Sequence, residues 1–219
     1  MRVVRWLILP LLAAGCSSFT AVRSAQVQPS HTLHAMASLS SPVGDQAGWF
    51  YSMDCASSCS TAVAALDLGW DYGLTNSRGT GGTLGVGLAG LTPYVEGYWQ
   101  IGAGKRPFGI GGRLGIPLSS WNEHRLYARL DMPNRDGSQR FLWNPGITLH
   151  TGNSPNGQNP GSIFAITNGF GMESGSDRVR WTPSIAVVTA RAGHSSYGQS
   201  QGSAWSTFAV AGIGVTYRP

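Results

Sequence analysis

The sequence predicts an all-β fold, a closed antiparallel up-and-down transmembrane β-barrel of about ten strands, with eight strands as the alternative. Three observations lead to this fold class. Runs of about 8–12 residues alternate between apolar side chains and polar or small ones, and turn-forming residues separate the runs. No stretch keeps a helical period. An export signal precedes the first run, so the chain is expected to leave the cytoplasm.

The composition excludes several classes of protein. Charged residues make up 11% of the chain, while it holds 31 Gly and 8 Trp. Disordered chains combine low hydrophobicity with high charge, so this composition argues against disorder. The formal net charge is +5, but the basic residues are scattered and only Lys105 and Arg106 are adjacent. We therefore expect no nucleic-acid partner.

Residues 1–15 have the parts of a signal peptide. Arg2 and Arg5 form a positive start, and the apolar stretch from Trp6 to Ala14 is too short to span a bilayer as a helix. Small residues then lead to Cys16. One interpretation of this stretch is a plain signal peptide whose cleavage site lies near a cysteine.

The stretch Leu12-Ala13-Ala14-Gly15-Cys16 resembles a bacterial lipoprotein signal, although that family usually has Leu where Ala13 stands. The resemblance implies that Cys16 is acylated, with palmitate among its acyl chains, and becomes the new N-terminus. The absence of acidic residues at Ser17 and Ser18 implies transport to the outer membrane. Residues 16–30 are then expected to be a lipidated polar tether.

Two further cysteines, Cys55 and Cys59, lie in a Ser-rich stretch. In an oxidising compartment a local disulfide between them is one interpretation, and two free thiols are the other. A metal site is not indicated, because no His or further Cys lies nearby.

Residues 31–219 are expected to form one barrel domain, with no second domain and no repeat of fixed period. The predicted strands are approximately residues 31–40, 62–74, 83–89, 94–102, 108–117, 124–132, 140–150, 162–173, 179–191 and 205–218.

The second run, AVAALDLGWDYGL, raises the question of which side faces inward. Leu66, Leu68 and Trp70 lie on one side of this strand, whereas Asp67 and the glycines of the run lie on the other. A soluble sandwich or barrel would also alternate, with its apolar side inward. The other runs repeat this separation, and the charged residues on their polar sides are Asp67, Asp71, Glu96, Arg113, Arg125, Arg129, Asp131, Glu173, Arg180 and Arg218.

Three features place the polar side inward. It is rich in small residues that suit an enclosed space, and its charges are nearly balanced. Its cations are arginines, which pair with carboxylates in bidentate geometry. Aromatic residues recur near the ends of the apolar side, as in a girdle at a membrane boundary. They are Trp70, Tyr72, Trp99, Trp143, Trp181 and Tyr217. We therefore expect a lipid-facing exterior and a lumenal network of the charged residues named above.

A bilayer requires the sheet to close, because an open edge leaves unpaired N–H and C=O groups. An even strand number puts both ends of the barrel domain on the periplasmic side, and three of the five outer connections exceed every inner one in length. Pro145 and Pro183 fall within predicted strands, so we expect bulges or rim positions there.

The runs AVAALDLGWDYGL, HRLYARLDM and FAVAGIGVTYRP make residues 31–219 similar to small outer-membrane β-barrel proteins of Gram-negative bacteria. The resemblance implies an architecture and not a particular activity. That family usually ends its last strand in Phe or Trp, whereas this chain ends in Tyr217-Arg218-Pro219.

No catalytic or metal-binding constellation is specific in this sequence, and no cofactor is implied. His34 and His150 lie on the lumenal side, and His34 with Asp67 and Asp71 suits a protease-like arrangement. Pairing among lumenal charges explains them better, because buried charges must be paired whatever the function. We expect outer-membrane lipid as the partner of the exterior, while the sequence identifies no partner at the outer loops.

The three function classes, in order, are a structural or surface-interaction barrel, a narrow channel and a membrane-embedded hydrolase. A barrel of about this strand number is largely filled by its own side chains, so no wide pore is expected.

Overall fold

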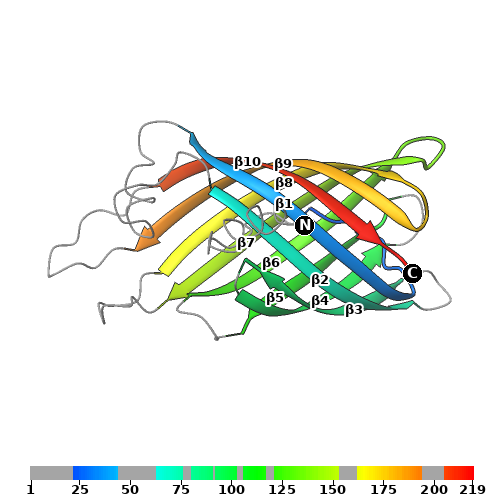
Figure 1. Ribbon diagram of the computed structural model, residues 1–219, viewed down its shortest axis with the longest axis horizontal. Helices are drawn as coiled ribbons and strands as arrows, with labels where there is room; N and C mark the ends of the chain where they lie inside the picture. Colours follow the sequence, from blue (N-terminus) through cyan, green and yellow to red (C-terminus); the bar gives the residue numbers. More distant parts are fainter. Residues whose placement is uncertain are drawn as a thin grey trace, which may run out of the picture.

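The computed structural model describes residues 22–43, 63–75, 80–90, 92–102, 106–116, 121–152, 162–193 and 205–219. They form ten antiparallel strands tilted around a common axis (Figure 1). The strands are β1 (Ser30–Val43), β2 (Val63–Thr75), β3 (Gly81–Ala89), β4 (Thr92–Gly102), β5 (Phe108–Gly115), β6 (Trp121–Pro133), β7 (Gln139–Gly152), β8 (Ser162–Gly175), β9 (Val179–Gly193) and β10 (Trp205–Tyr217).

The sheet closes because β1 pairs with both β2 and β10. Leu33 of β1 lies opposite Trp70 of β2 on one side and opposite Tyr217 of β10 on the other. Each remaining strand pairs with its neighbours in sequence, so the up-and-down topology and the count of ten strands are confirmed. Among the described residues, none forms a helix long and apolar enough to cross a membrane.

The barrel has two distinct ends. The turns at 134–138 and 176–178 lie at one end, together with Tyr217 at the end of β10, and we call this the turn end. The opposite end, where β1, β7 and β9 finish, is called the loop end. Figure 1 shows the C-terminus at the turn end.

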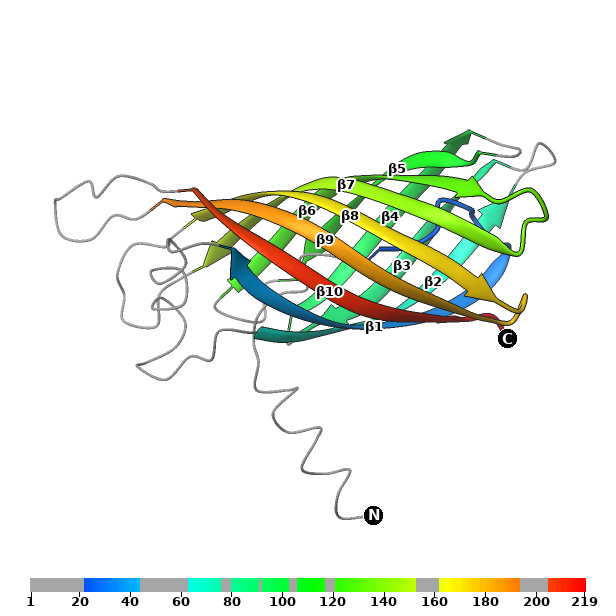
Figure 2. The same cartoon turned by 90° about the horizontal axis from the view of Figure 1, so that it is seen from above.

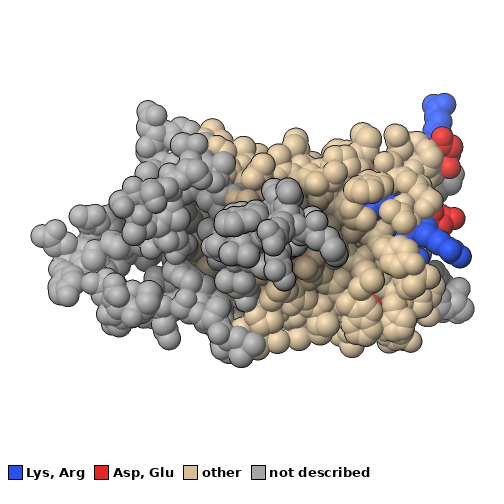
Figure 3. All heavy atoms as spheres, in the orientation of Figure 1, with Lys and Arg blue, Asp and Glu red and all other residues tan. Residues whose placement is uncertain are grey.

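Alternation along the strands separates an apolar exterior from a buried interior. Leu84, Leu126 and Ile185 point outward and are 69%, 63% and 66% exposed, whereas Asp67 and Asp131 are completely buried. On the face seen in Figure 3, the described charged residues gather at the turn end and the wall beside them carries none. This exterior is the opposite of a water-soluble barrel and matches the lipid-facing surface of a membrane barrel.

Lumenal glycines make room for aromatic rings. A Cβ atom at Gly87 would overlap the ring of Tyr94 and the carbonyl oxygen of Leu68. A Cβ atom at Gly109 would likewise overlap the ring of Tyr98. The glycines on the polar side of the strands therefore allow large side chains to lie flat across the interior.

The interior is polar in one region and apolar in another. Near the loop end, β8, β9 and β10 bury an apolar cluster where the sequence analysis expects polar or small side chains. Its members are Ile163, Ala165, Ala186, Val188, Ala190, Phe208 and Val210. The expectation of polar or small lumenal residues is therefore wrong for Ile163, Val188, Phe208 and Val210, because the last strands carry apolar residues on both sides at their loop ends.

Residues 22–29 run inside the barrel toward the turn end, where β1 begins (Figure 2). Val22, Ala25 and Val27 are buried there, and Val22 packs with Met36 and Leu142. The sequence analysis expects these residues in a polar tether, whereas the structure makes them part of the barrel interior. The contacts that hold them come from strands distant in sequence.

Pro145 lies in the middle of β7 and Pro183 is the fifth residue of β9, and both are on the outward face. The register between β6 and β7 is the same on both sides of Pro145, and that between β8 and β9 is the same on both sides of Pro183. Neither proline therefore forms a bulge or a rim position. Instead, each interrupts the pairing with one neighbouring strand, because proline has no N–H to donate.

Candidate functional site

The lumenal segment, residues 22–29, is held by side chains of the barrel wall. Its backbone has no ladder partner, so its N–H and C=O groups need other acceptors and donors. The Tyr98 hydroxyl donates to the carbonyl oxygen of Ala25 at 2.8 Å. Three backbone N–H groups donate to wall side chains: Arg23 to Asn144 at 2.8 Å, Ala25 to Asp131 at 2.7 Å and Val27 to Gln100 at 2.8 Å.

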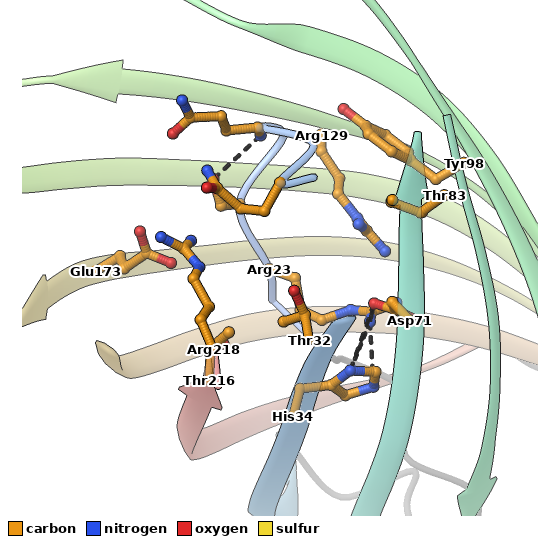
Figure 4. A pocket seen from close by; sticks show the side chains of 14 residues that line it. Arg23, Thr32, His34, Asp71, Thr83, Tyr98, Arg129, Glu173, Thr216 and Arg218 are labelled. Carbon is orange, nitrogen blue, oxygen red and sulfur yellow. Dashed lines mark hydrogen bonds and ion pairs between the residues drawn. The ribbon is translucent and has the colours of Figure 1, made fainter. Parts of the chain in front are cut away.

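Arg23 is the cation that this segment brings into the lumen. Its Nη1 atom lies 2.7 Å from Oδ2 of Asp71 and 2.9 Å from Nδ1 of His34. Its Nη2 atom pairs with Glu96. Figure 4 shows Arg23 beside Asp71 and His34, between the segment and strands β1 and β2. One guanidinium group therefore joins carboxylates from two different strands.

Two further arginines complete the central network. Nη1 of Arg113 lies 2.6 Å from Oδ2 of Asp67, and its Nη2 lies 3.1 Å from Oε2 of Glu96. Nη2 of Arg129 lies 2.6 Å from Oε1 of Glu96. All of these side chains are at least nine-tenths buried. Such charges are tolerated away from water only because each has a partner of opposite sign.

Tyrosine rings lie against these arginines. The guanidinium carbon of Arg113 is 3.7 Å from the centre of the Tyr94 ring. That of Arg129 lies 4.5 Å from the Tyr98 ring centre and 4.7 Å from that of Tyr127. The Tyr94 hydroxyl donates to Oδ1 of Asp67 at 2.8 Å. The rings add cation–π attraction and exclude water from the ion pairs.

A second group of charges lies near the turn end. Nη1 of Arg180 is 3.5 Å from Oε1 of Glu173, and Nη1 of Arg140 is 3.8 Å from Oδ2 of Asp131. Arg218 lies beside Glu173 in Figure 4, and both residues line a small cavity next to the lumenal segment. These contacts are longer than those of the central network.

Arg125 lies buried with its guanidinium carbon 5.6 Å from the Tyr127 ring centre. No ion pair within the described residues involves it at salt-bridge distance. Glu123, two residues earlier on the same side of β6, is also buried. The sequence analysis misses Glu123 because its predicted strand begins at residue 124.

The structure thus places all ten predicted network residues on the lumenal side of the wall. It joins five of them, together with Arg23, into one central cluster. Arg23 was not expected there, because residues 22–29 resemble a polar linker and nothing local signals their burial. Cys16, Cys55 and Cys59, the predicted lipidation and disulfide positions, lie outside the described residues.

Within the described parts of the chain, the space beside the lumenal segment is small and no catalytic constellation is brought together. A cavity of about 50 Å³ remains beside the lumenal segment, near the turn end. A buried water needs about 10–15 Å³ of cavity volume, so this cavity holds a few water molecules. His34 lies 3.6 Å from Asp67 and 3.5 Å from Asp71, but arginines already pair with both carboxylates. Among the described residues no group of His, Cys, Asp and Glu is arranged to hold a metal ion.

The sequence matches no protein-family model and no curated protein. Several solved structures are similar in shape. The Neisserial surface protein A aligns over 86% of this chain and 97% of its own, with 8% identity and a TM-score of 0.41. Outer membrane phospholipase A from Escherichia coli aligns over 89% and 95%, with 12% identity and a TM-score of 0.33. A mutant of the Rh. blastica porin aligns over 86% and 99%, with 7% identity and a TM-score of 0.24.

These similarities concern the barrel fold and do not transfer an activity. The identities are too low to match functional residues, so function has to be argued from the lumen and the surface of this chain.

Proposed function

We propose that this protein is an outer-membrane β-barrel closed by its own N-terminal segment, with a structural or surface-interaction role. The observation that carries the proposal is the occupied lumen. Residues 22–29 bind the wall through backbone hydrogen bonds and through Arg23, and the space beside them is about 50 Å³. A barrel filled in this way presents its exterior and its outer connections to partners and does not offer a passage.

The membrane location is supported by the wall itself. Large apolar side chains cover the exterior of all ten strands, and the closed sheet leaves no edge unpaired. Exposing an apolar surface of this extent to water is unfavourable, whereas the hydrocarbon of a bilayer accommodates it. Barrels with this exterior and with balanced charges inside belong to bacterial outer membranes.

A narrow channel is the second candidate. It is favoured by one observation, namely that a separate segment, and not the wall alone, occupies the lumen: residues 22–29 are joined to the wall by side-chain contacts and not by a ladder. If these contacts open, ions gain a path along the charged interior.

Single-channel recording in planar bilayers tests both candidates on the full mature chain. We expect no steady ohmic current from the wild type. Arg23→Gln removes the ion pairs of the segment, and we expect brief openings to appear in this variant. Arg178→Gln, which changes an exposed arginine in the turn before β9, is the matched control. A steady current through the wild type would replace the surface-interaction role with the channel.

Lipid attachment at Cys16 is part of the proposal and has its own test. The mass of the mature protein should exceed that of the polypeptide from Cys16 by the acyl chains, and Cys16→Ser should abolish the increase. Cys55→Ser should leave it unchanged. A mature protein without added mass would point to a plain signal peptide and leave the barrel function as it stands.

A further inference from the structure

Arginine side chains gather inside the turn end of strands β7 to β10. Arg140 lies near the start of β7 directly opposite Glu173 of β8, and Arg180 lies near the start of β9. Arg180 is opposite Thr216 of β10, and Arg218 follows two residues later on the same side of the chain. The ends of three strands thus bring three arginines to one part of the lumen.

Few carboxylates face these arginines. Nη1 of Arg180 lies 3.5 Å from Oε1 of Glu173. Nη1 of Arg140 lies 3.8 Å from Oδ2 of Asp131, which already accepts hydrogen bonds from the lumenal segment. The Asp177 carboxylate, 3.3 Å from Nη2 of Arg180, is fully exposed, so water screens it. Three arginines therefore face two buried carboxylates, whereas the central network pairs three arginines with three carboxylates.

Several guanidinium nitrogens in this group are buried without an acceptor among the described residues. They are Nε and Nη1 of Arg180, Nε of Arg140 and Nε of Arg218. The Arg180 side chain is only 7% exposed, so its N–H groups are shielded from water. Buried donors without acceptors cost free energy, and an anion with several oxygens is the group that satisfies them best.

The three cations also lie close enough to affect one another. Burial lowers the pKa of Arg218, although Glu173 opposes that shift. The charges of Arg180 and Arg140 lower the pKa of Arg218 further. A second negative charge at this position would relieve the repulsion among the arginines.

The small cavity beside the lumenal segment gives access to this group. Its lining includes Glu173, Thr216 and Arg218, and Figure 4 shows Arg218 beside Glu173 at its margin. Gln26 also lines the cavity and is exposed, so the cavity is in contact with water at the turn end. Its volume of about 50 Å³ has room for a few water molecules, which is comparable to a single phosphate group.

We propose that the turn end of the lumen binds a phosphate group, held by Arg180 and Arg218 with Arg140 beside them. A planar guanidinium donates two parallel N–H bonds to phosphate oxygens, and it stays charged at physiological pH. Glu173 opposes the anion, so binding is reversible. The phosphate group belongs either to a soluble compound or to a phospholipid headgroup, since both present the same oxygens. The inference goes beyond the surface role, because this site lies at the end opposite the loop end.

Titration calorimetry with inorganic phosphate tests the site on the full mature chain, folded in an uncharged detergent without phosphate groups. We expect one phosphate to bind per barrel. Arg180→Gln and Arg218→Gln should each weaken binding about tenfold, because each removes a cation with buried donors. Arg178→Gln, in the exposed turn beside the site, is the matched control and should change the affinity less than about twofold.

Glu173→Gln separates a binding site from a purely structural cluster. It removes a charge that opposes the anion, so phosphate should bind several times more tightly to this variant. Arg218 lies beyond the last strand, so Arg218→Gln keeps the test available if Arg180→Gln does not fold. Absence of binding in both the wild type and Glu173→Gln would overturn the proposal. Binding that neither arginine variant weakens would overturn it too.

Spin-labelled phosphatidylglycerol distinguishes the two sources of the phosphate group. In vesicles of phosphate-free galactolipid that contain the full chain, a headgroup site should immobilise part of this lipid in the wild type and not in Arg218→Gln. A site for soluble phosphate leaves the lipid mobile in both proteins while calorimetry still shows binding. A lipid that is mobile in both, with no phosphate bound in calorimetry, would contradict both forms of the proposal.

Discussion

The Nη1 atom of Arg23 lies 2.7 Å from Oδ2 of Asp71 inside the barrel, although the two residues are 48 positions apart in sequence. The pair joins the lumenal segment to strand β2, and both side chains are about nine-tenths buried. It also brings the positive charge that balances the carboxylates of β2 and β4. The ion pair thus connects the closure of the lumen with the stability of the wall.

Replacing Arg23 by Ala should destabilise the barrel and release the lumenal segment. Removal of one member of a buried ion pair leaves its partner uncompensated, which costs on the order of 3 kcal/mol. The free energy of unfolding in urea, measured in lipid vesicles, checks the loss, and protease cleavage between residues 22 and 29 checks the release. Arg178→Ala in the exposed turn is the control. An unchanged unfolding free energy with a protected segment would contradict the role of Arg23.

Arg113 and Asp67 should be energetically coupled. Both residues are buried and their charged atoms lie 2.6 Å apart. Arg113→Met or Asp67→Asn alone therefore leaves the other charge buried without its partner, which is unfavourable. The double variant should lose less than the sum of the two, with a coupling energy of about 1–3 kcal/mol.

The pair Arg180 and Asp177, 3.3 Å apart, provides the comparison, because the Asp177 side chain is fully exposed although Arg180 is buried. Its coupling energy should be below about 1 kcal/mol. Additive effects at Arg113 and Asp67 would mean that the central ion pair does not contribute as its geometry indicates.

Gly87→Ala should destabilise the barrel more than Gly97→Ala. A Cβ atom at Gly87 overlaps the Tyr94 ring and a backbone carbonyl, while one at Gly97 meets nothing within 4 Å. Overpacking of this kind costs about 1–3 kcal/mol. Unfolding midpoints of the two variants in urea give the comparison, and equal midpoints would show that the Tyr94 ring moves aside freely.

An arginine at Leu126 should be costly because Leu126 is 63% exposed on the outer face of β6. A charge on the lipid face costs about 2–4 kcal/mol at the bilayer midplane. Arg135→Glu, in the exposed turn after β6, should change the free energy of unfolding by less than about 0.5 kcal/mol. The measurement is again unfolding in lipid vesicles, and a Leu126→Arg variant as stable as wild type would place that face in water.

The alternation of side chains was sufficient to predict the closed ten-stranded barrel and the inward direction of residues such as Asp67 and Arg129. A period of two fixes which residues share a side, so it carries over to the structure directly. It does not say which inward residues touch one another, since the register of distant strands decides that. Arg113 meets Asp67 and Glu96 together only because β2, β4 and β5 lie around one small interior.

Two features could not be read from the pattern. Phe208 lies on the inward side of a stretch that is apolar on both sides, so hydropathy alone does not show that its ring is inside. Arg23 lies before the first strand among polar and small residues, and its burial depends on acceptors far along the chain, such as Asn144. A short segment with an arginine and buried apolar neighbours becomes recognisable only when the lumen that receives it is known.

The central claim is that hydrocarbon surrounds the wall while its charges face one another inside. Nitroxide labels placed one at a time along β6, from Leu126 to Asp131, test it most directly in lipid vesicles. We predict that labels at Leu126, Ala128 and Leu130 collide freely with dissolved oxygen and hardly with a water-soluble nickel complex, while labels at Tyr127, Arg129 and Asp131 collide little with either. Free collision of the Leu126, Ala128 and Leu130 labels with the nickel complex would contradict the account.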